Sequence, residues 1–491
     1  MSDARMSRRK ALGTMAAGLT VLGARGPAAA EPMEPRQRQA PELLVRGGRI
    51  VNADGTRFAD VRIVDGTITG IGANLRPGPG ARVMDATDRL VLPGGIDPHT
   101  HLQPAFIDDL TSGSMAALAG GITTVGTFAS PRLGETPLDA IDRLATQVVT
   151  DAIADVILHV STWPPTQELA AMMPALAGRG QPSIKVFMTR ADFSAHLPAF
   201  IGLLEAARDA GVVTLVHCED GALLAAAVRR LEAEGRTALR WYGESRPVVA
   251  EVAATQQAAA LCESTRAPMY VVHLSGARAL EACRPPREAG LPFFVETRPL
   301  YLHLTDERMS GPDAPLHIGQ PPLRTAADVE ALWQGIIGGA IDVLATDHAP
   351  WTHAQKMDPA LTVARVRPGV SNLQFMLPMY FSEGVGKRGL SLERFVETTS
   401  TNAARIFGLY PQKGVIREGA DGDLVIWDPA RSNEIRAEAD LSKSDYTVYE
   451  GWQVTGWPIA TIRRGDVVFE NGAITGSLGS GRLIARQRWR P

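Results

Sequence analysis

The 491-residue chain has little cysteine, little net charge and no long apolar run. Its three cysteines, Cys218, Cys262 and Cys283, are an odd number in a large chain, which excludes a disulfide framework as the basis of the fold. The formal net charge of -3 gives no reason to expect nucleic acid or an anionic membrane as a partner. No low-complexity tract or solenoid-like repeat is present. With 45% hydrophobic residues, the chain can bury one large core and a smaller one.

The N-terminus has the pattern of a targeting segment. Arg8 and Arg9 precede a weakly apolar run, and Ala28-Ala29-Ala30 forms an A-x-A-like cleavage site. These features predict a twin-arginine signal peptide over residues 1–30, a linker over 31–41 and export of the folded protein to the periplasm. The apolar run is too short to span a bilayer, so no membrane contact of the mature protein is expected. The alternative is a cytoplasmic protein with a disordered extension.

Both ends of the remaining chain alternate apolar and polar residues between turn signals. LLVRGGRIVNADGTRFADVRIVDGTITGIG does so early, and GDLVIWDP and TIRRGDVVFENGAITG do so late. This pattern is typical of half-buried antiparallel strands. It predicts one small β-sandwich composed of residues 42–92 and 408–480, followed by a tail over 481–491.

The middle of the chain repeats a strand-then-helix pattern about eight times. The apolar runs are GGIDPHTH, GITTVGTF, DVILHV, SIKVF, VTLVHCE, MYVVHLS, PFFVET and DVLATDH. Strands that alternate with helices favour parallel pairing, and eight such units predict an α/β fold with a (β/α)8 TIM barrel over residues 93–407.

Six polar residues fall at the carboxyl ends of these runs, where barrel active sites are built. They are His99, His101, Lys185, His217, His273 and Asp347. In the sequence HTH, alternate residues of a strand project to one side, so two imidazoles can bind a single ion. His217 and His273 can serve a second ion, and Asp347 supplies a carboxylate. The pattern predicts two divalent metal ions.

Lys185 lies inside the apolar run of SIKVFMTR, where a buried ammonium is costly. Two cations about 3.5–4 Å apart need an anionic bridge. Burial and nearby cations favour a neutral amine, which can add carbon dioxide and become a carbamate. Carboxylated Lys185 is therefore the predicted bridge. The alternative is a lysine that reaches the rim and pairs with Asp347.

The chain resembles the dihydropyrimidinase and D-hydantoinase branch of the amidohydrolase superfamily in many short blocks. They are GGIDPHTHLQ, AALAGGITT, SIKVFM, VHCED, VVHLSG, ETRPLYLHLT, PPLRTAADVEALW and ATDHAPW. The resemblance implies two metal ions, usually zinc, bridged by N6-carboxylysine at Lys185, and a homo-oligomer, tetramer or dimer. It assigns His99, His101 and Asp347 to one ion, and His217 and His273 to the other.

The implied reaction is hydrolytic opening of a small cyclic amide or imide. A hydroxide held between the ions attacks the ring carbonyl, and Asp347 takes its proton and returns it to the leaving nitrogen. The same carboxylate can instead be a ligand only.

Four positions concern substrate binding. Arg190 stands five residues after Lys185, where the family has a tyrosine that helps stabilise the oxyanion. An arginine there can also stabilise an oxyanion, bind a substrate carboxylate, or form a salt bridge at the rim. Gln320 precedes PPLR, where hydantoinases have serine and dihydroorotases asparagine. Gly369 is the remaining candidate for a backbone contact. Gln103 gives HTHLQ, the dihydropyrimidinase form, instead of the carboxylate-binding arginine of dihydroorotases.

Other activities remain open on the sequence alone. They are a dihydroorotase- or allantoinase-like cyclic amidase, a hydrolase of exocyclic amides such as N-acyl amino acids, and a non-catalytic scaffold relative. A scaffold is disfavoured because every metal ligand is present. His159, His303, His317, His348 and His353 have no assigned role.

Overall fold

The computed structural model describes residues 42–102 and 105–491. The predicted signal peptide over 1–30, the linker over 31–41 and Gln103 lie outside these residues and stay predictions. Among the described residues, no helix is both long and apolar enough to cross a bilayer.

Eight parallel strands form a nearly closed barrel in chain order. They are β8 (Gly95–Asp97), β9 (Ile122–Ala129), β10 (Asp155–Ser161), β11 (Ser183–Phe187), β12 (Val213–His217), β13 (Met269–Val271), β14 (Phe293–Thr297) and β15 (Val343–Leu344). A parallel bridge from Thr100 to His348 joins the first strand to the last. Strands of a parallel barrel are expected to be buried on both faces, as β9 (ITTVGTFA) is at every position.

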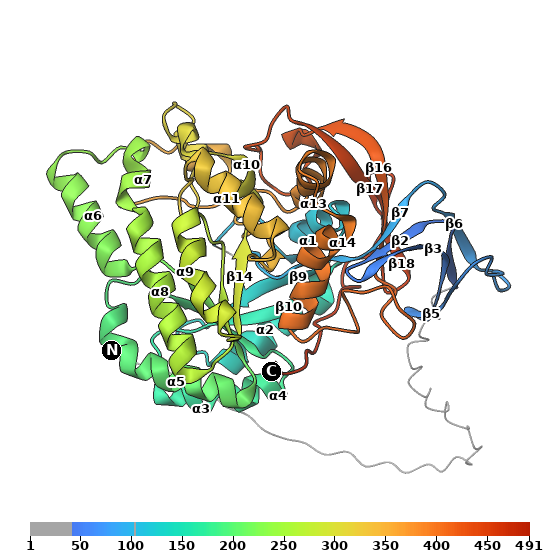
Figure 1. Ribbon diagram of the computed structural model, residues 1–491, viewed down its shortest axis with the longest axis horizontal. Coiled ribbons are helices and arrows are strands. Elements are labelled where there is room, and N and C mark those ends of the chain that lie inside the picture. Colours follow the sequence, from blue (N-terminus) through green and yellow to red (C-terminus); the bar gives the residue numbers. More distant parts are fainter. Residues whose placement is uncertain (1–41, 103–104) are drawn as a thin grey trace, which may run out of the picture. The chain divides into compact units, whose positions relative to one another are not determined.

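Helices cover the outside of the barrel, and Figure 1 shows α5, α6, α8 and α9 together on the side away from the sheets. The longer helices are α1 (Leu110–Ala119), α2 (Pro137–Asp151), α5 (Leu197–Ala210), α6 (Gly221–Ala233), α8 (Val248–Thr265), α9 (Ala277–Glu288) and α11 (Ala326–Ile337). The short ones are α3 (Gln167–Ala171), α4 (Met173–Gly178), α7 (Tyr242–Ser245), α10 (Pro299–His303), α12 (His353–Lys356), α13 (Met376–Tyr380), α14 (Leu392–Val396) and α15 (Asn402–Ile406). Capping boxes at Asp109, Thr136 and Thr325 fix where α1, α2 and α11 begin.

Two mixed sheets contain the remaining strands. The four-stranded sheet has the order β5 (Thr67–Gly72), β4 (Asp60–Val64), β1 (Leu43–Arg46), β6 (Arg82–Asp85). The seven-stranded sheet has the order β19 (Ala473–Ile474), β18 (Asp466–Glu470), β17 (Gln453–Arg463), β16 (Leu424–Glu434), β7 (Leu90–Pro93), β2 (Arg49–Asn52), β3 (Gly55–Phe58). Both sheets contribute to one apolar cluster that includes Val45, Ile63, Val91 and Ile426.

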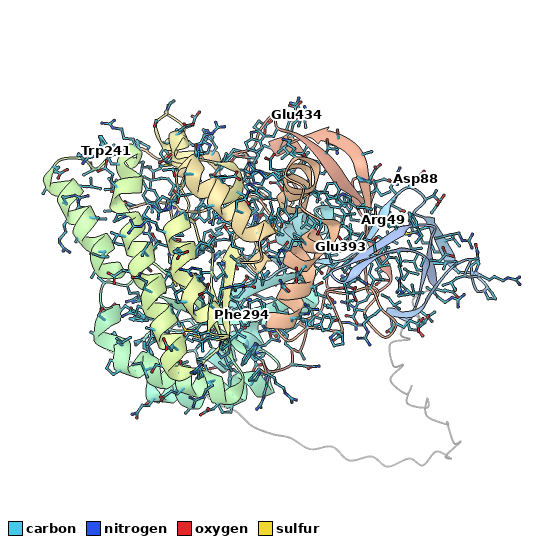
Figure 2. All side chains as sticks on the ribbon, viewed as in Figure 1. Arg49, Asp88, Trp241, Phe294, Glu393 and Glu434 are labelled. Carbon is cyan, nitrogen blue, oxygen red and sulfur yellow. The ribbon has the colours of Figure 1, made fainter. Side chains whose placement is uncertain are left out.

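The predicted fold class is confirmed: the chain forms a parallel barrel with mixed sheets built from both chain ends. The pairing of β7 with β16, which aligns Leu90 with Trp427, joins the two ends. Arg49 and Asp88 lie on the sheet side of the molecule, whereas Trp241 lies on the far helical side (Figure 2). The exact domain limits, 42–92 with 408–480 and 93–407, stay a prediction.

A buried ion cluster connects the start of β10 to the segment that enters β16. The Nζ atom of Lys413 lies 2.8, 2.9 and 2.6 Å from carboxylate oxygens of Asp155, Asp421 and Asp423. Arg464 also pairs with Asp155. The three aspartates could in principle ligate a cation, but the ammonium of Lys413 already lies among them.

Residues 481–489 line the amino-terminal end of the barrel. The peptide nitrogen of Ile484 donates to Val156 O at 2.9 Å, and that of Trp489 donates to Gly211 O at 2.9 Å. Between them the buried side chain of Arg486 donates to Leu158 O at 2.7 Å. The predicted tail is thus packed against the barrel, at the end opposite the metal-ligand candidates.

Candidate metal centre

The structure brings the six predicted ligands to the carboxyl ends of five barrel strands. His99 and His101 follow β8, Lys185 lies in β11 and His217 ends β12, while His273 follows β13 and Asp347 follows β15. All are almost fully buried except His101, whose side chain is 20% exposed. One partly open imidazole beside a buried group indicates a site that a small molecule can approach from one side.

His99, His101 and Asp347 form the first group of ligands. The Oδ1 atom of Asp347 lies 3.2 Å from His99 Nε2 and 2.9 Å from His101 Nε2. One ligand atom from each residue lies within 4.8 Å of the others, a spacing that could hold one metal ion. The sequence HTH therefore does present two imidazoles to one place, next to the predicted carboxylate.

His217 and His273 form the second group. Their ring centroids are 4.4 Å apart, and the His273 ring lies 5.4 Å from that of His99, so the two groups are adjacent. His273 and Asp347 have φ angles of 40° and 47°. A left-handed conformation costs a non-glycine residue about 1–3 kcal/mol and is typical of functional sites.

Lys185 lies buried near both groups. Its Nζ atom is 5.4 Å from the centroid of the Phe128 ring and 5.2 Å from that of Phe187. Burial lowers the pKa of Lys185 to about 8, although nearby Glu296 and Asp347 favour its charged form. Within residues 42–102 and 105–491 this amine has no hydrogen-bond partner, so it is not paired with Asp347. A rim pair with Asp347, the alternative considered above, does not form.

The chemistry of these donors fits divalent metal ions. His99 Nε2, His273 Nδ1 and Lys185 Nζ are buried and have no hydrogen-bond partner in the described part of the chain. His99 Nδ1 lies 2.8 Å from Glu296, and His217 Nε2 lies 2.7 Å from Glu219. Metal-binding histidines commonly donate one ring N–H to a carboxylate and leave the other nitrogen to the ion.

Sequence reasoning missed Glu219, Glu296 and Arg298. Glu296 accepts from the peptide nitrogen of His273 at 2.8 Å as well as contacting His99, and Arg298 pairs with Asp347. Burial raises the pKa of Glu296 to about 8. The available signal was the run FFVETR, in which two charged residues alternate at the end of a buried strand.

Arg190 lies at the rim, outside the buried centre. Its guanidinium carbon is 4.7 Å from the centroid of the Trp163 ring, and its side chain is 48% exposed. Its Nε atom lies 3.4 Å from Asp192, which is also exposed. Because both side chains are about half exposed, the guanidinium remains accessible to an anion.

Gln320 and Gly369 lie on two loops that Lys356 ties together. The Nζ atom of Lys356 donates to Ile318 O at 3.0 Å, Arg367 O at 2.8 Å and Gly369 O at 2.9 Å. Gly369 has a φ of 110°, and a Cβ there would lie 2.3 Å from Ala349 O, so only glycine fits. Its N–H donates to Ile318 O and its carbonyl accepts from Lys356, so both backbone polar atoms of Gly369 already have protein partners.

Two of the unassigned histidines form buried hydrogen bonds next to the candidate ligands. His159 Nε2 lies 2.8 Å from Pro98 O, directly before His99, and His348 Nε2 lies 2.8 Å from Asp108. His303 and His317 contact backbone carbonyls of their own turns, and the ring of His353 lies against Tyr446. These contacts give structural roles to residues that have no evident chemical one.

A barrel with imidazoles, a lysine and a carboxylate at one rim is the arrangement expected of a metal-dependent hydrolase. A model of the amidohydrolase family matches residues 90–468. D-hydantoinase from Ralstonia pickettii is 32% identical, covering 91% of this chain and 100% of that protein. The crystal structure of dihydropyrimidinase from Brevibacillus agri matches with a TM-score of 0.87 at 33% identity, covering 92% of this chain and 100% of that one. L-hydantoinase from Arthrobacter aurescens matches with a TM-score of 0.83 at 29% identity, covering 90% and 99%.

The chain belongs to the amidohydrolase family, in its dihydropyrimidinase and D-hydantoinase branch. It is a hydrolase of cyclic amides, which confirms the predicted class of enzyme. Relatives named for D- and for L-hydantoinase activity both match, so the family does not fix the stereochemical preference.

Proposed function

We propose that the protein opens a small hydantoin- or dihydropyrimidine-type ring by hydrolysis at two divalent metal ions, with zinc as the expected metal. The observation that carries this proposal is the set of three buried nitrogen atoms, on His99, His273 and Lys185, that make no hydrogen bond among the described residues. His99, His101 and Asp347 would hold one ion, and His217 and His273 the other. When bound, the ions lower the pKa of water and polarise a ring carbonyl.

Lys185 is proposed to be carboxylated. Its neutral amine adds carbon dioxide and loses one proton, which gives a carbamate with two oxygens and one negative charge. Burial disfavours the ammonium form, and the lack of an ion pair leaves the amine available. The carbamate would supply the anionic bridge between the two groups of histidines.

Asp347 moves the proton in the proposed reaction. Water adds to the ring carbonyl and gives up a proton to Asp347, which returns it to the ring nitrogen as the C–N bond breaks. The products are a carboxylate and an amine, urea or amide nitrogen on one opened chain. The Oδ1 atom of Asp347 lies beside both histidines of HTH, which supports a role for its carboxylate at the proposed reaction centre.

A ring-opening assay tests the proposed function. We expect purified protein, loaded with zinc or manganese in bicarbonate, to open dihydrouracil or 5-substituted hydantoins. Cyclic imides, dihydroorotate, allantoin and N-acyl amino acids complete the panel. Turnover of dihydroorotate or allantoin alone would support the dihydroorotase- or allantoinase-like alternative, and acyl release alone would point to an exocyclic amidase. A protein with two bound metals and no turnover of any substrate would contradict the proposal.

Arg190 is proposed to contact negatively charged substrates. We expect Arg190→Ala to lower kcat/KM about tenfold for anionic rings and less than about threefold for neutral ones, because one charge-assisted hydrogen bond is lost. Arg179→Ala is the matched control: this exposed arginine pairs with Asp142 and precedes the same strand, β11. Equal losses on neutral and anionic rings would leave Arg190 as a rim residue only.

A homo-oligomer, tetramer or dimer, and export through the twin-arginine signal are proposed alongside the activity. The oligomer follows from the family resemblance, and export follows from the N-terminal pattern.

A further inference from the structure

We propose that Arg298 is a positioning residue that keeps Asp347 on the metal ion of the His99–His101 group, and so controls retention of that one ion. The inference rests on the proposed metal-dependent function, and it concerns a residue at the end of β14 that holds no ion itself. Arg298 follows this strand directly, and Glu296 lies two residues before it.

The seventh strand therefore supports the ligands of its neighbours. Residues two apart on a strand project to the same side. Glu296 contacts His99 and the backbone of His273, and Arg298 pairs with Asp347. No predicted ligand comes from β14, but this strand determines the orientation of ligands on both sides of it.

The two oxygens of Asp347 have different partners. Oδ1 faces the Nε2 atoms of His99 and His101, at 3.2 and 2.9 Å, whereas Oδ2 accepts from Arg298 Nη1. A guanidinium is planar and fixes a carboxylate oxygen in direction as well as in distance. Without it, the carboxylate could rotate, and Oδ1 would no longer be directed at the imidazoles.

The surroundings hold Arg298 itself in one place. Its side chain is fully buried, and its guanidinium carbon lies 5.3 Å from the centroid of the Tyr301 ring. A Cβ on Gly319 would lie 3.6 Å from Nη1, so the neighbouring loop packs close to the guanidinium. Burial and the Tyr301 ring thus limit movement of the guanidinium away from Asp347.

Stability alone does not account for this arginine. Within residues 42–102 and 105–491, its Nε and Nη2 atoms have no hydrogen-bond partner. A buried ion pair with unpaired donors is a poor stabiliser compared with a well-packed apolar side chain. A role in holding a ligand explains why a costly group lies here.

The effect should be confined to one ion. His217 is held by Glu219, and His273 by Glu296 through its backbone. Within the described part of the chain, neither histidine forms a hydrogen bond or ion pair with Arg298. Removing Arg298 therefore weakens the first group of ligands and leaves the second group supported.

The test is the metal content of purified Arg298→Met, Arg298→Lys and Arg298→Ala proteins after dialysis. We expect about one zinc per chain in Arg298→Met against two in the parent, because loss of a ligand's supporting partner typically weakens metal binding about 10- to 100-fold. Arg298→Lys should release one ion to a chelator faster than the parent and keep the other. Guanidinium added to Arg298→Ala should restore binding of the ion at the His99–His101 group.

Arg287→Met is the matched control. Arg287 pairs with Asp342 directly before β15, at the opposite end of the strand that leads to Asp347, and this variant should keep two ions. The inference would be overturned if Arg298→Met and Arg298→Lys both kept two ions and only their KM for anionic rings rose. That result would indicate that Arg298 contacts the substrate. Equal loss of both ions would also overturn it.

If Arg298→Met does not fold, the chelator release rate of Arg298→Lys decides. A parent protein that binds two metals but opens no ring would refute the proposed function and leave the metal-content test of Arg298 intact.

Discussion

Replacing Lys185 by alanine is expected to lower kcat/KM roughly 10³- to 10⁴-fold, because the anionic bridge between two metal ions contributes several kcal/mol to the transition state. Lys185 is buried, lacks a hydrogen-bond partner within the described chain and lies beside both groups of histidines. Metal content should fall below two ions per chain. Kinetics on the ring that the parent opens, together with elemental analysis, give the measurement.

Short carboxylic acids provide a second readout for this position. In Lys185→Ala, propionate can occupy the space of the lost side chain and supply a carboxylate, so activity and metal content should partly return. Lys185→Arg is the control: it keeps a cation but cannot form the carbamate and fills the space, and it should be inactive with or without propionate. Full activity of Lys185→Arg would contradict a carboxylated bridge.

Replacing Lys413 by methionine is expected to lower the free energy of unfolding by about 3–5 kcal/mol, because removal of one partner leaves buried charges without compensation. Lys413 is the shared partner of Asp155, Asp421 and Asp423, and its side chain is 1% exposed. Denaturant unfolding of metal-loaded protein measures the change. The exposed pair of Lys443 and Asp109 gives a control, Lys443→Met, which should change stability by less than about 1 kcal/mol.

The same cluster gives a pH dependence with a defined sign. Burial would raise the pKa of Asp155, but Lys413 and Arg464 overcome this and lower it to about 2, below its ordinary 3.8. A carboxyl group whose pKa is lower in the folded state stabilises the fold above its unfolded pKa. This contribution should be complete above pH 3.8 and be lost as the pH falls towards 2. If the parent and Lys413→Met already had equal free energies of unfolding at pH 6, the ion cluster would not be the source of the stability.

The grouping of the candidate ligands could be predicted from the sequence because each candidate lies near the end of an apolar run. Parallel strands place their carboxyl ends on one rim, so His99, His217 and Asp347 could be brought together without knowing any contact. The eight runs likewise predicted the barrel, and like patterns at both ends predicted the sheets.

Residues that act through a neighbour were harder to predict. Glu296 and Arg298 have the same local pattern as any charged pair at a strand end, and only the three-dimensional structure shows that they meet His99 and Asp347. Arg190 shows the converse problem, because its spacing from Lys185 could not indicate that its guanidinium lies against Trp163. Side-chain direction at a rim depends on loops, whose conformations follow no simple period.

The joining of both chain ends also has a consequence for synthesis. β2 and β7 are made early, but β16, the partner that pairs Trp427 with Leu90, follows over 300 residues later. At about 5–20 residues per second, β7 waits roughly 15 to 70 seconds on the ribosome for that partner. The barrel floor is completed later still, since Trp489, which donates to Gly211, is made after β16. During this interval an apolar strand edge is unpaired, so the nascent chain is the form of this protein most exposed to aggregation and most dependent on chaperones.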